Sequence, residues 1–434
     1  MKIGIIGAGF VGLCIGCVIA DKGHEVILVD VDKEKVEKIN SAIPPFHENG
    51  LKELLEKHAG KRLKATVDYT ELEKTEIDFI CVGTPSKENG EIELKYLKSA
   101  CESLSDVLKN TEHFKVVIVK STVVPTTTEK FVIPILEKSR KKEGKDFGVC
   151  VNPEFLREGF AIFDFLNQDR IVIGSRCKRA EKILEEFYSK HFPNSPIVKT
   201  DLRTAEMIKY ASNAFLATKI SFINEIGNIC KKLGIDVYKV VEGMKYDPRI
   251  GEHFLNAGIG YGGSCLPKDV KALITFAAKI GAEPKLLKAV DEVNERQAEK
   301  LVEIAKQKVG ELKGKKIAVL GLSFKAGTND TRETRSLPLI VKLIEEGAEV
   351  VVYDPVVKSL PEELNGVSNC IKIAESLEEA VKEAEIIKIA TDWEHFKELE
   401  KMENLEGKLI FEGRRLLNKE EIAKKCAHIE GVCW

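Results

Sequence analysis

Three glycines near the start of the chain place the strongest limit on its fold. Gly7, Gly9 and Gly12 follow the apolar run Lys2–Gly7 and precede a stretch of helical character. In a strand–turn–helix unit such glycines allow a tight turn, close approach of a pyrophosphate, and close packing of helix on strand. The helix N-terminus then offers N–H groups and a positive dipole to the phosphates. The sequence therefore predicts a dinucleotide-binding unit.

A carboxylate at the end of the next predicted strand supports this interpretation. Asp30 closes the run Glu25–Asp30, where its oxygens can accept hydrogen bonds from an adenosine ribose. The same carboxylate would repel a 2′-phosphate, so the motif favours NAD over NADP. A solvated strand end is the alternative, and the complete glycine motif beside Asp30 disfavours it.

The apolar segment Ile3–Ala20 also resembles a signal peptide or membrane span, but its glycines favour a strand, a turn and a helix. Cys14 and Cys17 would then be small buried side chains of that helix. Eleven cysteines at irregular spacing predict no disulfide framework, which favours a reducing cytoplasm. The net charge of −2 gives no field to recruit nucleic acid or an anionic membrane.

Two parts of the chain alternate apolar, β-branched runs with helical stretches, and a mostly helical region lies between them. Its longest helix is expected over Arg203–Leu233, ended by Gly234. We predict an α/β fold with two Rossmann-like, doubly wound parallel-sheet domains, at 1–200 and 309–434, joined by a central helical domain at 201–308. The expected strands are Lys2–Gly7, Glu25–Asp30, Asp78–Gly83, Lys115–Lys120, Gly148–Val151, Arg170–Gly174, Lys316–Gly321 and Glu349–Asp354.

Cys265 is the strongest candidate nucleophile. Four glycines between Gly258 and Gly263 precede it, so the backbone could approach a ligand closely. Pro267 marks the first turn of a helix expected through Val270–Lys279. A helix start beside Lys268 favours a reactive thiolate. The alternative is a buried structural cysteine, which we expect of most of the other ten.

Further polar residues stand where ligands bind in such folds. Glu154 and Glu158 follow a predicted strand, where either could be a general base, a hydroxyl binder or a surface charge. Lys209 and Asn213 are four apart on the long predicted helix, so they share a face. A cation and an amide together can stabilise an oxyanion, although such pairs are usually only a polar helix face.

In sequence order these residues resemble one family. The motifs are Gly7-x-Gly9-x-x-Gly12, Lys120-Ser-Thr122, Asn152-Pro-Glu-Phe-Leu-Arg-Glu158-Gly, Lys209-x-x-x-Asn213-Ala-Phe, Arg249-Ile-Gly, Gly260-Tyr-Gly-Gly-Ser-Cys265-x-x-Lys-Asp269 and Phe324-Lys325. Over essentially the whole chain they resemble the UDP-glucose/GDP-mannose dehydrogenases. The resemblance implies an N-terminal NAD domain, a central domain that forms a homodimer, and a C-terminal domain that binds a nucleotide sugar.

The resemblance also implies a four-electron oxidation of UDP-glucose to UDP-glucuronate with two NAD⁺. Cys265 is expected to capture the C6 aldehyde as a thiohemiacetal, and the second oxidation to give a thioester that water hydrolyses. The implied roles are general base for Glu154, water binding for Thr122, oxyanion stabilisation for Lys209 and Asn213, and support of the proton network for Asp269.

The resemblance places further residues at the two ligands and implies no metal. Those near NAD are Gly7, Gly9, Phe10, Val11, Gly12, Asp30, Lys35, Thr84, Thr122, Glu158, Lys268 and Arg332. Those at the nucleotide sugar are Phe155, Leu156, Lys209, Asn213, Arg249 (across the dimer interface), Phe254, Leu255, Asn256, Gly258, Tyr261, Gly262, Phe324, Lys325 and Arg414.

Departures from the family's usual pattern leave the substrate open. They are Phe46-His-Glu-Asn-Gly50, Leu266 and Glu412-Gly-Arg-Arg415. Leu266 and Lys325-Ala-Gly327 favour GDP-mannose as the alternative, whereas Ser264 disfavours UDP-N-acetylhexosamines, whose enzymes typically have histidine there. Two other classes remain: a two-electron hydroxyacid dehydrogenase, which needs no catalytic cysteine, and a nucleotide sensor that binds without turnover.

Overall fold

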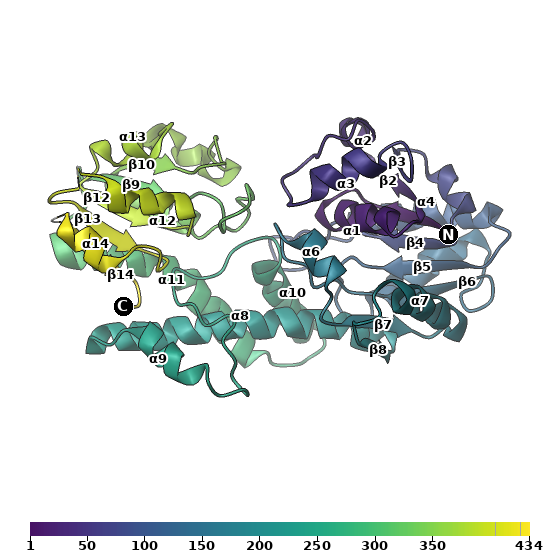
Figure 1. The fold of residues 1–434 in the computed structure, drawn as a ribbon. Helices are drawn as coiled ribbons and strands as arrows, with labels where there is room; N and C mark the ends of the chain where they lie inside the picture. Colours follow the sequence, from purple (N-terminus) through teal and green to yellow (C-terminus); the bar gives the residue numbers. More distant parts are fainter. Residues whose placement is uncertain (404, 426) are drawn as a thin grey trace. The chain divides into compact units, whose positions relative to one another are not determined.

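The computed structural model describes residues 1–403, 405–425 and 427–434 of the chain. These residues form two compact units, Met1–Ser212 and Asn213–Trp434. Each unit contains a mainly parallel sheet covered by helices, which confirms the predicted α/β class (Figure 1). The division falls inside α8 (Leu202–Leu233), within one residue of the predicted long helix, and Gly234 follows with a φ of +69°. The boundaries between the three predicted domains stay a prediction.

The sheet of the first unit has eight strands in the order β3-β2-β1-β4-β5-β6-β7-β8. Adjacent strands are parallel except β6 and β7, which are antiparallel and depart from the predicted all-parallel sheet. The carboxyl ends of β1 to β6 therefore meet at one edge. The strands are β1 Lys2–Ile6, β2 Glu25–Val29, β3 Leu63–Thr66, β4 Ile77–Ile80, β5 Lys115–Val119, β6 Phe147–Val151, β7 Ile171–Ser175 and β8 Ile197–Thr200.

The helices of this unit bear out the interpretation of the N-terminal segment. Cys14 and Cys17 are fully buried in α1, and burial raises the pKa of the Cys17 thiol to about 12. In the described part of the chain, no helix is long and apolar enough to cross a membrane. The helices are α1 Phe10–Asp21, α2 Lys33–Asn40, α3 Leu51–His58, α4 Lys95–Asn110, α5 Ile133–Leu136, α6 Ala161–Leu166 and α7 Lys178–His191.

The sheet of the second unit is parallel throughout, in the order β11-β10-β9-β12-β13-β14. Its strands are β9 Lys316–Leu320, β10 Glu349–Tyr353, β11 Ile371–Ile373, β12 Ile386–Ile389, β13 Leu409–Glu412 and β14 His428–Gly431. Its helices beyond α8 are α9 Val237–Met244, α10 Leu266–Lys279, α11 Lys285–Val309, α12 Ser336–Glu345, α13 Leu377–Lys382 and α14 Lys419–Lys424.

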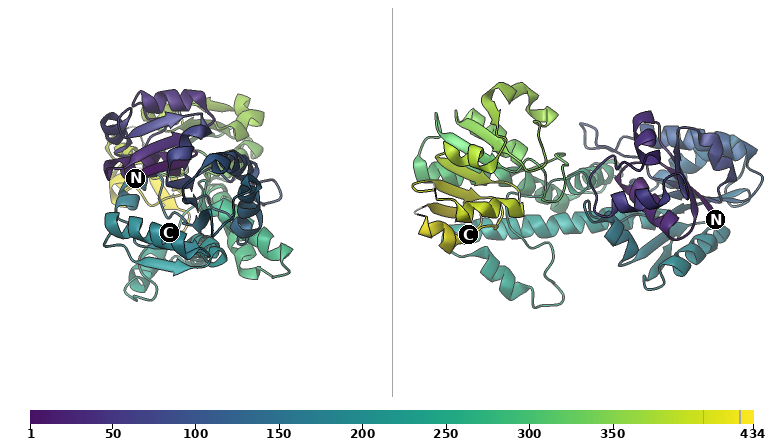
Figure 2. Two further views of the ribbon diagram at one scale, coloured as in Figure 1. Left: turned by 90° about the vertical axis from the view of Figure 1, so that its right-hand side faces the viewer. Right: turned by 45° about the horizontal axis from the view of Figure 1, so that its top comes forward.

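Both faces of this second sheet are buried (Figures 1 and 2). Ile317 and Val319 of β9 pack with α11 and α12, whereas Ala318 and Leu320 pack with α13 and α14. Alternate residues of a strand point to opposite faces, so a strand covered on both sides is apolar along its whole length. This explains why the run Lys316–Gly321 was recognisable as a strand.

One lysine breaks this apolar pattern. Lys388 of β12 is fully buried, and its Nζ donates a hydrogen bond to the carbonyl oxygen of Leu301 in α11 at 2.8 Å. Burial lowers the pKa of the Lys388 ammonium to about 7. In the unfolded chain this pKa returns to about 10.4, so between these values unfolding takes up a proton. The buried Lys388 therefore lowers the free energy of unfolding most at and below neutral pH.

Replacing this amine by an apolar group should stabilise the protein. We expect Lys388→Met to raise the free energy of unfolding by at least about 1 kcal/mol at pH 7, and by less at pH 9. Urea unfolding at the two pH values measures this, with the exposed Lys382→Met as the control, which should change little. A Lys388→Met protein that is less stable than wild type at both pH values would contradict the interpretation.

Candidate active site

The turn between β1 and α1 has the geometry that the glycine motif predicts. Gly7 has a φ of +100°, which favours glycine. A Cβ on Gly12 would lie 1.9 Å from the carbonyl oxygen of Gly7, so only glycine permits this close packing. A Cβ on Gly9 would meet no heavy atom within 4 Å, which leaves the backbone open to a ligand. These residues fit a pyrophosphate at the start of α1.

Asp30, directly after β2, fits the ribose end of the same cofactor. Its Oδ2 accepts a hydrogen bond from the Ala8 amide at 2.6 Å, and its Oδ1 accepts one from the Asp32 amide at 3.0 Å. The Lys35 ammonium lies 3.5 Å from Oδ2. Because a carboxylate has about four acceptor positions, these three donors leave one for a ribose hydroxyl.

The loops after the next two strands are joined at the same edge. The hydroxyl of Thr84, after β4, donates to the carbonyl oxygen of Thr122, after β5, at 2.8 Å. Phe10 and Val11, predicted beside NAD, begin α1 and pack partly buried against the unit's core. The structure thus places the first unit's predicted NAD residues after β1, β2, β4 and β5, apart from Glu158, which follows β6.

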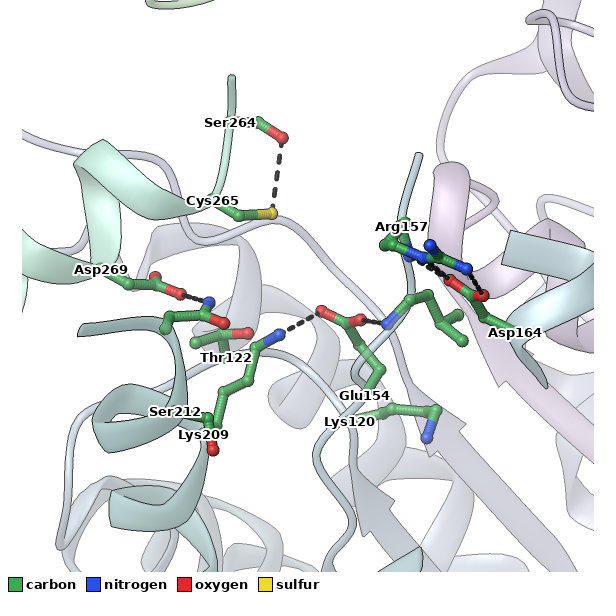
Figure 3. Close-up of polar contacts among 12 residues, drawn as sticks. Lys120, Thr122, Glu154, Arg157, Asp164, Lys209, Ser212, Ser264, Cys265 and Asp269 are labelled. Carbon is green, nitrogen blue, oxygen red and sulfur yellow. Dashed lines mark hydrogen bonds and ion pairs between the residues drawn. The ribbon is translucent and has the colours of Figure 1, made fainter. Parts of the chain in front are cut away.

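A buried ion pair follows β6. The Lys209 ammonium of α8 lies 3.0 Å from Oε1 of Glu154, and both side chains are less than one-tenth exposed (Figure 3). The Leu156 amide donates to Oε2 of Glu154 at 2.6 Å. Burial raises the pKa of Glu154, but the charges of Lys209 and Lys120 and these hydrogen bonds outweigh it and lower the pKa below its usual value. Glu154 is therefore an ionised base held in a dry environment.

Lys120 is a second buried cation beside this pair, and sequence reasoning gave it no role. Its Nζ donates to Oδ1 of Asn152 at 2.9 Å, and the Tyr188 hydroxyl donates to the same oxygen at 2.5 Å. Burial lowers the pKa of Lys120 to about 8. Lys120 precedes Thr122 and Asn152 precedes Glu154, so this contact fixes both loops. Its sequence signals were its position at a strand end and the motif Lys120-Ser-Thr122, neither of which shows the contact with Asn152.

Cys265 stands at the start of α10 in the second unit, as predicted. It is the N-cap residue of that helix, its side chain is exposed, and the Ser264 hydroxyl lies 3.6 Å from its sulfur (Figure 3). Seven of the other nine described cysteines are buried. The helix N-terminus offers its dipole to a thiolate at this position.

Asp269, one turn into α10, is bound on both carboxylate oxygens. The Asn213 amide donates to Oδ2 at 2.6 Å, and the Lys268 ammonium lies 2.5 Å from Oδ1. Asp269 is almost fully buried. The three predicted residues are thus brought together, and the carboxylate fixes the orientation of the Asn213 amide.

The glycines before Cys265 have a structural requirement that the sequence did not show. A Cβ on Gly262 would lie 2.2 Å from the carbonyl oxygen of Glu333, and one on Gly263 would lie 2.6 Å from the Phe324 ring. At Gly258 it would lie 2.4 Å from the carbonyl oxygen of Gly413. The loop needs glycine because other parts of the protein pack directly on its backbone.

The remaining residues predicted at NAD or the nucleotide sugar lie in both units. Arg249 pairs with Asp247 at 2.6 Å and its side chain is 87% exposed, and Arg332 pairs with Asp330. The Phe155 ring lies under the Arg170 guanidinium at 3.7 Å. Leu156 and Glu158 belong to the first unit, and Phe254, Leu255, Asn256, Tyr261, Lys325 and Arg414 to the second.

One of the three departures from the family pattern, Glu412-Gly-Arg-Arg415, has a structural explanation at both of its ends. Arg415 binds Asp236 at 2.7 Å and stacks on Tyr238, which ties this turn to the start of α9. Glu412 is buried at the end of β13 and accepts hydrogen bonds from the amides of Leu416 and Leu417. Burial raises the pKa of Glu412 to about 7.

Comparison with known proteins agrees with this geometry. Three family profiles match in order: the NAD-binding domain of the UDP-glucose/GDP-mannose dehydrogenase family at residues 1–192, its central domain at 203–296, and its UDP-binding domain at 318–419. The chain belongs to the UDP-glucose/GDP-mannose dehydrogenase family. It is therefore an NAD-dependent oxidoreductase of nucleotide sugars, and the predicted cofactor and enzyme class are confirmed.

Individual relatives cover nearly the whole chain. A UDP-glucose 6-dehydrogenase of Haloferax volcanii is 42% identical, over 97% of this chain and 98% of its own length. A GDP-mannose 6-dehydrogenase of Pseudomonas putida is 38% identical over the full length of both chains. The solved UDP-glucose dehydrogenase of Pyrobaculum islandicum superposes with a TM-score of 0.92 at 36% identity, covering 100% of this chain and 98% of that one.

The position of Asp30 predicts its effect on cofactor affinity. Removing its carboxylate in Asp30→Ala should raise the Kd for NAD⁺ about 10- to 100-fold, because a charge-assisted hydrogen bond is lost. It should also reduce the preference for NAD⁺ over NADP⁺. Calorimetric titration of both cofactors measures this. The control is Asp32→Asn, which keeps the cap of α2 and should stay within about twofold of wild type. An unchanged Asp30→Ala affinity would exclude a ribose contact.

Proposed function

We propose that this dehydrogenase oxidises UDP-glucose to UDP-glucuronate in two steps, each transferring two electrons. The observation that carries the proposal is the exposed Cys265 thiol at the start of α10, in a chain whose other described cysteines are mostly buried. A thiol is required only if an aldehyde must be held for a second oxidation. The relatives named for UDP-glucose support this choice of sugar.

In the proposed chemistry Cys265 forms and breaks the covalent bond to the substrate, and Glu154 accepts a proton from water. Bound NAD⁺ supplies the hydride acceptor for each oxidation. The Cys265 sulfur adds to the C6 aldehyde, and the aldehyde oxygen becomes the hydroxyl of a thiohemiacetal. Loss of a hydride and a proton from this species leaves a thioester. Water, which gives one proton to Glu154, attacks the thioester carbon, and the C–S bond breaks to release the carboxylic acid and the Cys265 thiolate. The acid's proton then passes to the thiolate, which leaves the carboxylate and the Cys265 thiol.

The remaining predicted residues act on charge and position in this scheme. Lys209 and the Asn213 amide stabilise the oxyanions that form at C6. Thr122 holds the attacking water, and Asp269 keeps the Asn213 amide pointing toward the substrate. In the second unit, Phe324, Lys325 and Arg414 bind the nucleotide sugar.

GDP-mannose is the second candidate substrate. Leu266 follows the cysteine, and a GDP-mannose 6-dehydrogenase matches over the full length of both chains. The chemistry is the same for either sugar, so only the contacts to base and hexose would differ.

We also propose a homodimer formed through α8. Phe215, Phe222 and Ile229 are exposed at spacings of seven residues, so they share one face of the helix. An apolar stripe of this kind typically covers a partner helix. Arg249, which is exposed and paired with Asp247, would then reach the site of the partner subunit.

The stoichiometry of NADH decides between the proposed reaction and its alternatives. We expect two NADH for each UDP-glucose consumed, measured by absorbance with separate incubations for GDP-mannose and UDP-N-acetylhexosamines. Cys265→Ser should lower turnover at least about 100-fold, whereas Cys370→Ser, at the other exposed cysteine among the described residues, should not. Undiminished turnover of Cys265→Ser with one NADH per sugar would favour a two-electron dehydrogenase.

The ion pair of Glu154 predicts the pH dependence. If Glu154 must be ionised, the rate falls as pH drops through its lowered pKa. Lys209→Gln leaves burial as the dominant effect, so the pKa rises and the acidic limb of kcat/KM should move up by at least about one pH unit. The exposed Lys199→Gln is the control. An unmoved acidic limb in Lys209→Gln would remove Glu154 from the role of base.

A further inference from the structure

The loop that carries Cys265 is held at almost every residue by side chains and loops of the second unit. The Gly258 amide donates to Oδ1 of Asn224 at 2.8 Å, and the Ile259 amide donates to the carbonyl oxygen of Gly413 at 3.2 Å. Arg414 donates to the carbonyl oxygen of Gly260 at 2.8 Å. Such a loop is set by its partners, since glycine backbone has little conformational preference of its own.

Asn294 of α11 makes the closest of these contacts. Its Oδ1 accepts a hydrogen bond from the Tyr261 amide at 2.7 Å, and its Nδ2 donates to the Tyr261 carbonyl oxygen at 3.1 Å. One side chain thus satisfies both main-chain groups of Tyr261, as a neighbouring strand would. Asn294 is fully buried, and a Cβ on Gly260 would lie 2.6 Å from its Oδ1.

The backbone of α11 is itself fixed at this point. The Arg335 guanidinium, which is almost fully buried, donates to the carbonyl oxygens of Asn294 and Glu295 at 2.9 and 3.0 Å. Arg335 ends the segment that also packs on Gly262 and Gly263. Asn294 is therefore a rigid reference for the loop and not a mobile side chain.

Only three residues separate Tyr261 from Cys265, and hydrogen bonds restrict their backbone. Gly263 donates its amide to the carbonyl oxygen of Arg332 at 3.1 Å. Cys265 then caps α10, whose first bond runs from the Asp269 amide to the Cys265 carbonyl oxygen at 2.9 Å. With the main chain of Tyr261, Gly263 and Cys265 held, the Cβ atom that carries the sulfur has a defined position, and only rotation about the Cα–Cβ bond remains.

We propose that Asn294 is a positioning residue for Cys265: by clamping both main-chain groups of Tyr261, it holds the thiol where it can capture the aldehyde. The inference rests on the proposed thiohemiacetal chemistry. Asn294 binds the main chain of Tyr261 and not the thiol itself. We expect its loss to slow the oxidation that needs the thiol more than the first hydride transfer, which does not.

The test separates the two oxidations in a single turnover. In Asn294→Ala, the first NADH should form at the wild-type rate and the second about 10- to 100-fold more slowly, because a small displacement of a nucleophile has effects of this size. Both rates are measured at saturating UDP-glucose, so a change of KM through the predicted sugar-binding positions Gly258, Tyr261 and Gly262 of the same loop does not enter the comparison. Hydrogen–deuterium exchange of the segment 258–265 should accelerate, measured by mass spectrometry without any substrate.

Two further variants keep the result interpretable. Asn228 of α8 donates a hydrogen bond to Gln297 of α11 at 2.9 Å and contacts no residue of the loop. In Asn228→Ala both NADH should therefore form at the wild-type rates. Asn294→Ser keeps a polar group at this buried position without adding a charge, but it is too short to reach both main-chain groups of Tyr261, so it should show an effect of the same sign. It replaces Asn294→Ala if that protein does not fold.

The outcomes separate this inference from the proposed function. A second NADH formed at the wild-type rate in both Asn294 variants, or slowed equally in Asn228→Ala, would overturn the positioning role. Unchanged exchange of the loop would overturn the clamp itself. A wild-type protein that forms only one NADH would refute the thioester chemistry, whereas the exchange measurement would still decide whether Asn294 holds the loop.

Discussion

The hydrogen bonds between parallel strands are the constraint on which the first unit depends. β1 pairs with β2 on one side and β4 on the other, in a register that ends the three strands together. β5 and β6 continue the same edge. The carboxyl ends of these five strands therefore gather the glycine turn, Asp30, Thr84, Thr122 and Glu154 from distant parts of the sequence. The shared direction of these strands is enough to bring the residues to one edge of the sheet.

Burial and charge pairing together set the ionisation of Glu154. Glu154 is removed from water, which alone would protonate it, yet the adjacent Lys209 and the Leu156 amide keep it ionised. A carboxylate held this way is a base without a solvent shell to shed. The same pairing explains why neither charge could be removed singly without cost, since each leaves the other buried and uncompensated.

The sequence was most informative where a residue's role depends on its neighbours in the chain. Apolar runs located eight strands, and Gly7, Gly12 and Asp30 have the positions that the motif requires. The strands β3, β8 and β11 to β14 were not predicted. In β3 and β8 a lysine stands in the middle of a four-residue strand, so neither has a continuous apolar run. Lys120 and Asn294 could not be assigned, because their partners Asn152 and Tyr261 lie about thirty residues away and meet them only through packing. The glycines before Cys265 were recognised, but the protein surfaces pressing on them were not visible in the sequence.

The two Rossmann-like sheets show why similar patterns need not imply the same ligand. Both have the strand order in which the first strand lies inside and the next two follow outward, and both place an aspartate after the second strand. Asp30 accepts three hydrogen bonds or ion-pair contacts, one of them from a partly exposed lysine. Asp354 instead accepts five: three from Leu322 and Ser323, and two from the amides of Val356 and Val357. Since a carboxylate offers about four acceptor positions, Asp354 has none left for a ribose and serves only to hold its own turn. The second unit has thus kept the architecture of a dinucleotide site while its aspartate is committed to the protein, and any nucleotide it binds must be recognised by other residues.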